Sequence, residues 1–248
     1  MRLAPLCLLT AWTCGLAAAQ DQGAAEGQAL LARMIDAQRK VQQMTANYVQ
    51  YRSSPLTKKP LTSKGTLAFR RAPGCVVFRV TEPRVSVIRL DTAHYEVWHP
   101  DKARLERFVL PSDEMPRLLF DALAPTTTSL EKGFVVESCT AVVGVATQRE
   151  ITLVPTDVKT KRVAAKITIT LDTDGPRLCA FGYRDPRGGD VRVELNDLKL
   201  AEKADEKLFA LDVPAATKVT VQQIPEPKEE AGTSEPAKAS QPKAGGKG

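Results

Sequence analysis

The residues best suited to metal chemistry in this 248-residue chain are two histidines and the acidic side chains near them. His94 and Glu96 are two positions apart, so on a strand their side chains share one face. His99 and Asp101 follow closely. A metal ion needs three or four converging ligands, but His99 precedes Pro100 in an expected turn that directs it away from His94. The pattern therefore predicts no metal site and no metal cofactor.

A catalytic centre cannot be assembled from the remaining residues either. The serines lack the turn context of a nucleophile elbow, and a cysteine paired with a histidine has no local signature. Gly188-Gly189 lacks the following helix that a phosphate-binding loop requires. Because no nucleophile, base and orienting partner come together, we predict no catalytic residues and a protein that is not an enzyme.

The charge of the chain points to no nucleic-acid partner. The net charge is +6, spread over the whole length, which is a weak signal for nucleic acid or acidic membranes. The basic pairs Lys58-Lys59 and Arg70-Arg71 have no interleaved aromatic residues that would stack on bases.

The first 19 residues have the features of a secretory signal peptide. Arg2 precedes a short apolar stretch that ends near Leu16, and Ala17-Ala18-Ala19 offers a small-residue cleavage site. The apolar stretch is shorter than the roughly 20 residues that a membrane span needs. We therefore expect a soluble exported protein cleaved near Ala19. A weak membrane anchor and a lipid-modified Cys14 are the alternatives.

A period of two dominates the chain from Thr45 to Pro214 and predicts strands. The strands recur about every 8–12 residues and are joined by tight turns such as Asp174-Gly175. An amphipathic helix is expected before them, over residues 24–44. The pattern predicts a mainly β fold of the α+β class, in which an antiparallel sheet curls into a barrel or half-barrel.

A short second helix is expected within the β region, over residues 113–123. Ser112-Asp113-Glu114 can begin it and Pro125 ends it. One of its faces is apolar, and that face is formed by Met115, Leu118, Leu119, Ala122 and Leu123. Both expected helices should bury their apolar faces against the sheet.

The C-terminal residues 225–248 contain no bulky apolar side chain, so we expect a disordered tail after a single domain of residues 20–224. Cleavage near Ala19 leaves Cys75, Cys139 and Cys179, which allow at most one internal disulfide.

A curled sheet whose inner face is only partly covered by helices keeps an apolar cavity. Such a cavity suits an acyl chain, which gains about 0.8 kcal/mol per buried methylene. If the helices complete the core instead, the cavity is filled, and periodicity does not separate these alternatives. The residues concerned are Leu67, Phe69, Phe78, Val80, Ile88 and Trp98, although for Trp98 core packing is favoured.

The order of several motifs from about Ala29 to Val221 resembles the outer-membrane lipoprotein carrier proteins, the LolA-like family. The stretch from Lys64 to Gly74 combines a glycine, an alternating strand, arginines and a proline. Tyr95 to Pro100, Asp185 to Asn196 and Leu208 to Pro214 follow in the family's order.

The resemblance implies an unclosed β-barrel whose concave face is covered by the N-terminal helix and a short lid helix. It implies a periplasmic carrier that shuttles acylated lipoproteins from an inner-membrane releasing ABC transporter towards an outer-membrane acceptor. Acyl chains would lie in the cavity, with Met115, Leu118, Leu119 and Leu123 forming the lid. We expect a monomer without cofactors.

The resemblance also implies a latch for the lid. Arg71 would hydrogen-bond the lid backbone, but Ala72 separates it from Pro73, so Arg70 is the alternative. The alternative function is a periplasmic sensor or regulatory module that binds lipids or lipoproteins on the same fold.

Overall fold

The computed structural model describes residues 14–112, 114–215 and 217–223. The first 13 residues of the expected signal peptide, Asp113 of the expected lid and the whole expected tail of residues 225–248 lie outside the described residues.

One 12-stranded sheet forms the body of the described chain. In chain order its strands are β1 (Gln43–Ser53), β2 (Leu61–Arg70), β3 (Cys75–Glu82), β4 (Ser86–Asp91), β5 (His94–His99), β6 (Arg104–Val109), β7 (Phe134–Val142), β8 (Val145–Pro155), β9 (Lys166–Asp172), β10 (Leu178–Arg184), β11 (Asp190–Ala201) and β12 (Lys218–Gln223). Their order across the sheet is β12-β6-β5-β4-β3-β2-β1-β11-β10-β9-β8-β7. The two end strands do not pair with each other, which confirms the expected unclosed, curved sheet.

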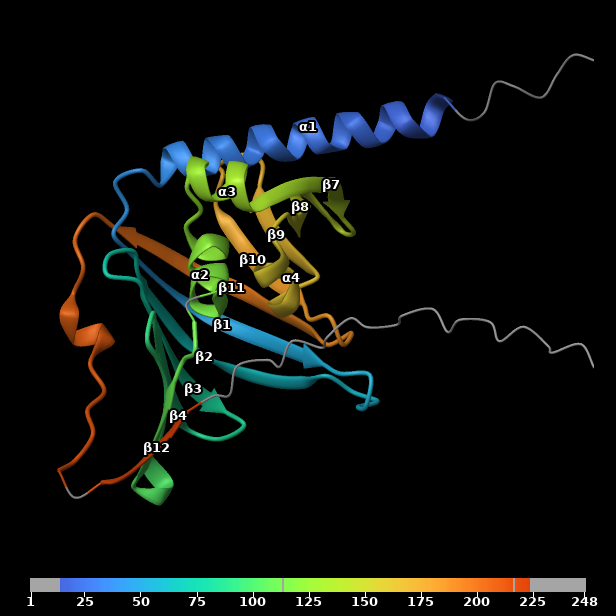
Figure 1. Cartoon of the computed structure of the whole chain (residues 1–248). Helices are drawn as coiled ribbons and strands as arrows, with labels where there is room; N and C mark the ends of the chain where they lie inside the picture. The colour runs from blue at the N-terminus through green and yellow to red at the C-terminus, as the bar shows by residue number, and fades with distance from the viewer. Residues whose placement is uncertain (1–13, 113, 216, 224–248) are drawn as a thin grey trace, which may run out of the picture.

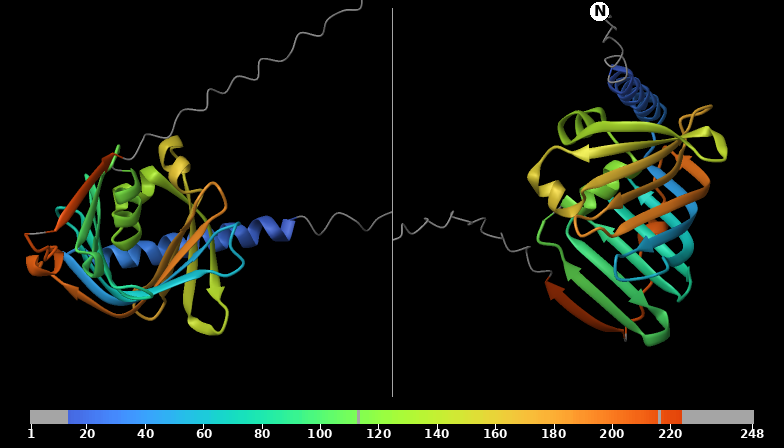
Figure 2. Two further views of the ribbon diagram at one scale, coloured as in Figure 1. Left: turned by 90° about the horizontal axis from the view of Figure 1, so that it is seen from below. Right: turned by 90° about the vertical axis from the view of Figure 1, so that its right-hand side faces the viewer.

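Four α-helices accompany the sheet in the described chain: α1 (Cys14–Ala37), α2 (Glu114–Leu123), α3 (Thr127–Gly133) and α4 (Val158–Val163). Two short 3₁₀ helices are η1 (Pro100–Lys102) and η2 (Glu206–Phe209). α1 runs along one margin of the sheet, and α2 lies inside its curve (Figure 1). Seen from below, the sheet bends around α2 (Figure 2, left). The expected cover of the concave face by two helices is thus present.

The first helix is displaced from its expected range of 24–44. It ends at Ala37, and a turn separates it from β1. Met44 belongs to the strand instead, because it alternates with Ala46 and Tyr48 in the same inner core. The position of Met44 fits the helical spacing of the residues before it and also the strand alternation of the residues after it.

Besides the two 3₁₀ helices, the elements α3, α4 and β12 were not expected from the sequence. α3 and α4 are too short for a periodic pattern, and capping side chains define their starts. Thr126 forms a capping box with Ser129, and Asp157 accepts a hydrogen bond from the backbone N–H of Thr160 at 2.8 Å. β12 pairs with β6 in parallel, whereas the other strand pairs are antiparallel.

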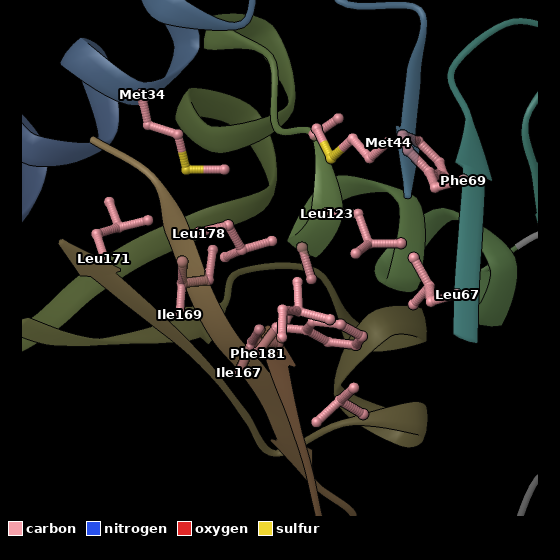
Figure 3. Close-up of a cluster of buried hydrophobic side chains, with 14 of the residues drawn as sticks. Met34, Met44, Leu67, Phe69, Leu123, Ile167, Ile169, Leu171, Leu178 and Phe181 are labelled. Carbon is pink, nitrogen blue, oxygen red and sulfur yellow. The ribbon is translucent and has the colours of Figure 1, made fainter. Parts of the chain in front are cut away.

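The inner face of the sheet holds the main hydrophobic core. The core includes a densely filled part formed by Met34, Met44, Leu67, Phe69, Leu123, Ile169, Leu171 and Leu178. Figure 3 shows Leu123 of α2 between the side chains of β2 and those of β9 and β10. α2 is therefore part of the core as well as a cover over the sheet.

The outer face carries a smaller cluster, in which Cys75, Val77 and Ala68 pack under Phe209 of η2. No helix within the described residues has the length and hydropathy that crossing a membrane requires.

Candidate functional site

A cavity of about 220 Å³ lies between α2 and the concave face of the sheet. It is lined from both arms of the sheet, that is, from β3 to β5 on one side of β1 and from β9 to β11 on the other. The apolar lining is formed by Phe78, Ile88, Leu90, Tyr95, Met115, Leu118, Leu119, Ala122, Ile167, Phe181, Tyr183, Val191 and Val193. In the following, "the cavity" means this space.

The expected lid residues divide between the cavity and the filled part. Leu118 and Leu119 line the cavity with Met115, whose side chain is 40% exposed. Leu123 is fully buried in the filled part. α2 thus occupies volume that a guest would need. Small-molecule sites usually measure about 300–1,000 Å³, so the cavity is small while α2 is docked.

The expected cavity residues divide in the same way. Phe78 and Ile88 face each other across β3 and β4 and line the cavity. Leu67 and Phe69 point into the filled part instead. Val80 is on the inner face by strand alternation and is buried, but it does not line the cavity.

Trp98 lies on the wrong face to line the cavity, which corrects its expected place there. It is paired with Val87, which packs against the outer cluster. Directly opposed residues share a face, so Trp98 is on the outer side, where it is 7% exposed. Its neighbour Val97 is paired with Ile88 and takes the inner position. The period of two was right, but it does not reveal which set of side chains faces inward.

α2 is held against β2 through an aromatic contact. The rings of Phe69 and Phe120 are 5.8 Å apart between centroids. Phe120 also fills the space beside Gly74, where an added Cβ would lie 2.6 Å from its ring. A side chain at position 74 would therefore force the Phe120 ring to shift.

Arg71 binds the segment that follows α1, not the lid helix. Its Nε donates to the carbonyl of Val41 at 2.9 Å and its Nη2 donates to that of Gln38 at 3.3 Å. The expected hydrogen bond to the 113–123 helix is absent from the described contacts of Arg71. The latch therefore connects the end of β2 with the end of α1.

Arg70 is engaged on the outer face. Its guanidinium forms an ion pair with Glu206 and lies 4.9 Å from the centroid of the Phe209 ring. Neither arginine hydrogen-bonds α2 in the described structure, so the two expected alternatives for a lid latch both serve other contacts.

Four residues with polar groups at the cavity were not singled out by the sequence. Arg52 and Gln50 come from the end of β1, and Tyr95 and Tyr183 come from opposite arms of the sheet. Burial raises the pKa of both tyrosine hydroxyls, and Arg52 acts on both electrostatically. For the two residues of β1, the sequence signal was present in the alternation of that strand, in which Tyr48, Gln50 and Arg52 share the inner face.

A second apolar pocket, of about 330 Å³, lies between α1, α3 and the β7–β8 pair. Leu31, Leu130 and Phe134 are among its lining residues, and it shares none with the cavity. This pocket therefore offers apolar surface beside α1, away from the cavity beneath α2.

The candidate metal-binding side chains have other partners. Glu96 accepts from Arg89 at 3.1 Å and from Arg107 at 2.7 Å. His94 lies 3.5 Å from Asp91, and His99 lies 4.0 Å from Glu106. Within the described residues, no group of three or more His, Cys, Asp or Glu side chains is arranged to hold a metal ion.

The chain matches one protein family over residues 39–212, described as outer membrane lipoprotein carrier protein LolA. No curated protein matches it.

Several solved structures are similar to the chain at low identity. One is an uncharacterized conserved protein from Thermus thermophilus, with a TM-score of 0.45 and 10% identity, covering 79% of this chain and 99% of that one. A LolA superfamily protein from Nitrosomonas europaea has a TM-score of 0.41 and 11% identity, with coverage of 75% and 98%. The Mycobacterium tuberculosis lipoprotein LppX has a TM-score of 0.42 and 14% identity, with coverage of 73% and 98%.

Proposed function

Because the chain belongs to the family of outer membrane lipoprotein carrier proteins, we propose that it binds the acyl chains of lipoproteins beneath α2 and carries them across the periplasm. The observation that supports this most directly is the apolar cavity between α2 and both arms of the sheet. An acyl chain placed there would gain about 0.8 kcal/mol for each methylene removed from water.

The lid role of α2 follows from its place in the core. Leu118 and Ala122 are buried on the inner face, so an entering chain must displace them. Their lost burial is replaced by contacts with the guest, which gives a two-state balance between docked helix and bound chain.

The latch at Arg71 keeps the rest of the fold in place while α2 moves. It ties the residues after α1 to the end of β2, and it makes no described contact with α2. The movement is therefore confined to the lid, and the sheet persists as a preformed receptor.

The route of transport is the finer part of the proposal. The signal-like residues 1–19 would deliver the protein to the periplasm. There it would accept lipoproteins from an inner-membrane releasing ABC transporter and pass them to an outer-membrane acceptor. The carrier would act as a monomer.

A charge placed in the cavity tests the proposal. We expect Ile88→Glu to lose binding of a synthetic triacylated lipopeptide, because a carboxylate in an apolar site carries a large desolvation cost. Val85→Glu is the matched control, since Val85 lies near the start of β4 and is 59% exposed. Native mass spectrometry measures how many lipopeptides are bound per protein. Circular dichroism verifies that both variants keep the sheet.

The expected result is one lipopeptide per carrier for wild type and Val85→Glu, and none for folded Ile88→Glu. Full binding by Ile88→Glu would overturn the placement of the acyl chains beneath α2. Absence of binding by the wild-type protein would overturn the carrier function.

A further inference from the structure

The polar groups at the cavity include several hydrogen-bond donors that converge from distant strands. Arg52 projects from the inner face of β1, and Tyr95 and Tyr183 approach it from β5 and β10. Burial keeps both tyrosines protonated by raising their pKa, so each hydroxyl has a proton to donate. A guanidinium adds up to five N–H donors in a planar fork.

Arg52 lacks a carboxylate partner of the kind that several other arginines of the sheet have. On the outer face, Arg107 pairs with Glu96 at 2.7 Å and Arg192 pairs with Glu150 at 2.7 Å. Arg52 forms no hydrogen bond or ion pair with any described residue, and no acidic side chain of the described chain lines the cavity. The positive charge at the cavity is therefore not neutralised by an acidic group in its lining.

The acidic groups that act electrostatically on the two tyrosines have other partners. Glu106, which acts on Tyr95, is ion-paired with Arg104. Asp185, which acts on Tyr183, accepts a hydrogen bond from the backbone N–H of Arg187 at 2.7 Å. These contacts leave the guanidinium of Arg52 available for a ligand.

We propose that Arg52, Tyr95 and Tyr183 form an oxyanion-binding site at the cavity, and that the cavity accepts a second class of guest besides lipoproteins, an acyl chain bearing a carboxylate or phosphate head group. This inference rests on the proposed function, because the chain of the guest occupies the cavity described above. The fork of an arginine matches both oxyanions with two parallel hydrogen bonds. The docked cavity measures only about 220 Å³, so α2 must move to admit this chain as it does for a lipoprotein.

The contribution of the head group to binding is measured with three amphiphiles that have the same C12 chain. They are laurate, dodecyl phosphate and dodecanol. Their affinities are measured by displacement of a neutral fluorescent probe, at concentrations below micelle formation. We expect both anions to bind about tenfold more tightly than the alcohol, as a charge-assisted hydrogen bond permits.

Arg52→Gln removes the guanidinium, and Arg84→Gln is the control. Arg84 is exposed between β3 and β4, outside the cavity lining, so it changes the net charge equally. We expect Arg52→Gln to bind all three amphiphiles with the affinity of dodecanol, and Arg84→Gln to keep the wild-type preference. Circular dichroism verifies the fold, and Arg52 is itself exposed.

The outcomes distinguish the two proposals. Equal binding of anions and alcohol by the wild-type protein, or an unchanged preference in Arg52→Gln, would overturn the oxyanion site while leaving acyl-chain binding intact. If none of the three amphiphiles binds folded protein, both proposals fail. If the anions are preferred, tighter binding of laurate indicates free fatty acids as the source, and tighter binding of dodecyl phosphate indicates phospholipid.

Discussion

The filled part of the core and the cavity share the concave face of one sheet, but α2 packs on them differently. In the filled part, Leu123 and Phe69 are almost completely excluded from solvent, and Met34 of α1 completes the packing. At the cavity, Met115 is 40% exposed and Arg52 has no acidic partner among the described lining residues. The filled part is thus the region that stabilises the fold, and the cavity is the region to which the proposed function assigns the guest.

The largest difference in stability is expected between shortening an α2 side chain in the filled part and shortening one at the cavity. We expect Leu123→Ala to lower the free energy of unfolding by about 2–5 kcal/mol, because it opens a void in a packed core. Met115→Ala should change stability by about 0.5 kcal/mol or less, since much of its side chain is exposed. Urea unfolding measures both, and equal losses would remove the distinction between the two regions.

Removing the Arg71 guanidinium should have an intermediate effect. Arg71→Met keeps the aliphatic length but leaves two backbone carbonyls without their donor, at an expected cost of about 1–3 kcal/mol. Arg70→Met should cost about 1 kcal/mol or less, because its ion-pair partner Glu206 is 72% exposed. Thermal unfolding at matched pH compares them. A larger loss for Arg70→Met would mean that the outer contact, not the α1 connection, is the main stabilising one.

Displacing the ring of Phe120 should have a small effect on stability and a measurable effect on binding. In Gly74→Ala the new Cβ would lie 2.6 Å from the Phe120 ring, so the ring must shift. We expect a loss of about 1 kcal/mol, at the lower end of the cost of overpacking. The backbone amides of α2 should exchange hydrogen faster and the lipopeptide should bind more tightly. Unchanged exchange in α2 would contradict the lid assignment.

The local patterns predicted the strands and α2 well because their periodicities follow directly from backbone geometry. Strand alternation left cavity lining and filled core as alternatives for Phe78, and the structure places Phe78 and Ile88 in the cavity lining. The same alternation did not distinguish inner from outer for Trp98, since facing is decided by how the whole sheet curves.

Arg52 illustrates a second limit of sequence-based prediction. A charged residue at the end of a strand resembles an ordinary solvated residue. Arg52 becomes part of the proposed oxyanion site only because Tyr95 and Tyr183, from distant strands, line the same cavity. The parallel pairing of β12 with β6 was missed for a similar reason, because it joins segments far apart in the chain.

The central pairing of β1 with β11 has a consequence for the order of folding. At one end of that pair, Ser53 and Asp190 are 137 residues apart in the chain. Closing so long a loop is entropically costly and slow, and sheets with such distant contacts fold late. On the proposed export route the N-terminus crosses the membrane first, so the pairing of β1 with β11 must wait until β11 emerges. The two arms of the sheet can therefore join only when translocation is nearly complete, and until then the free edge of β1 is available to a chaperone that holds extended chains.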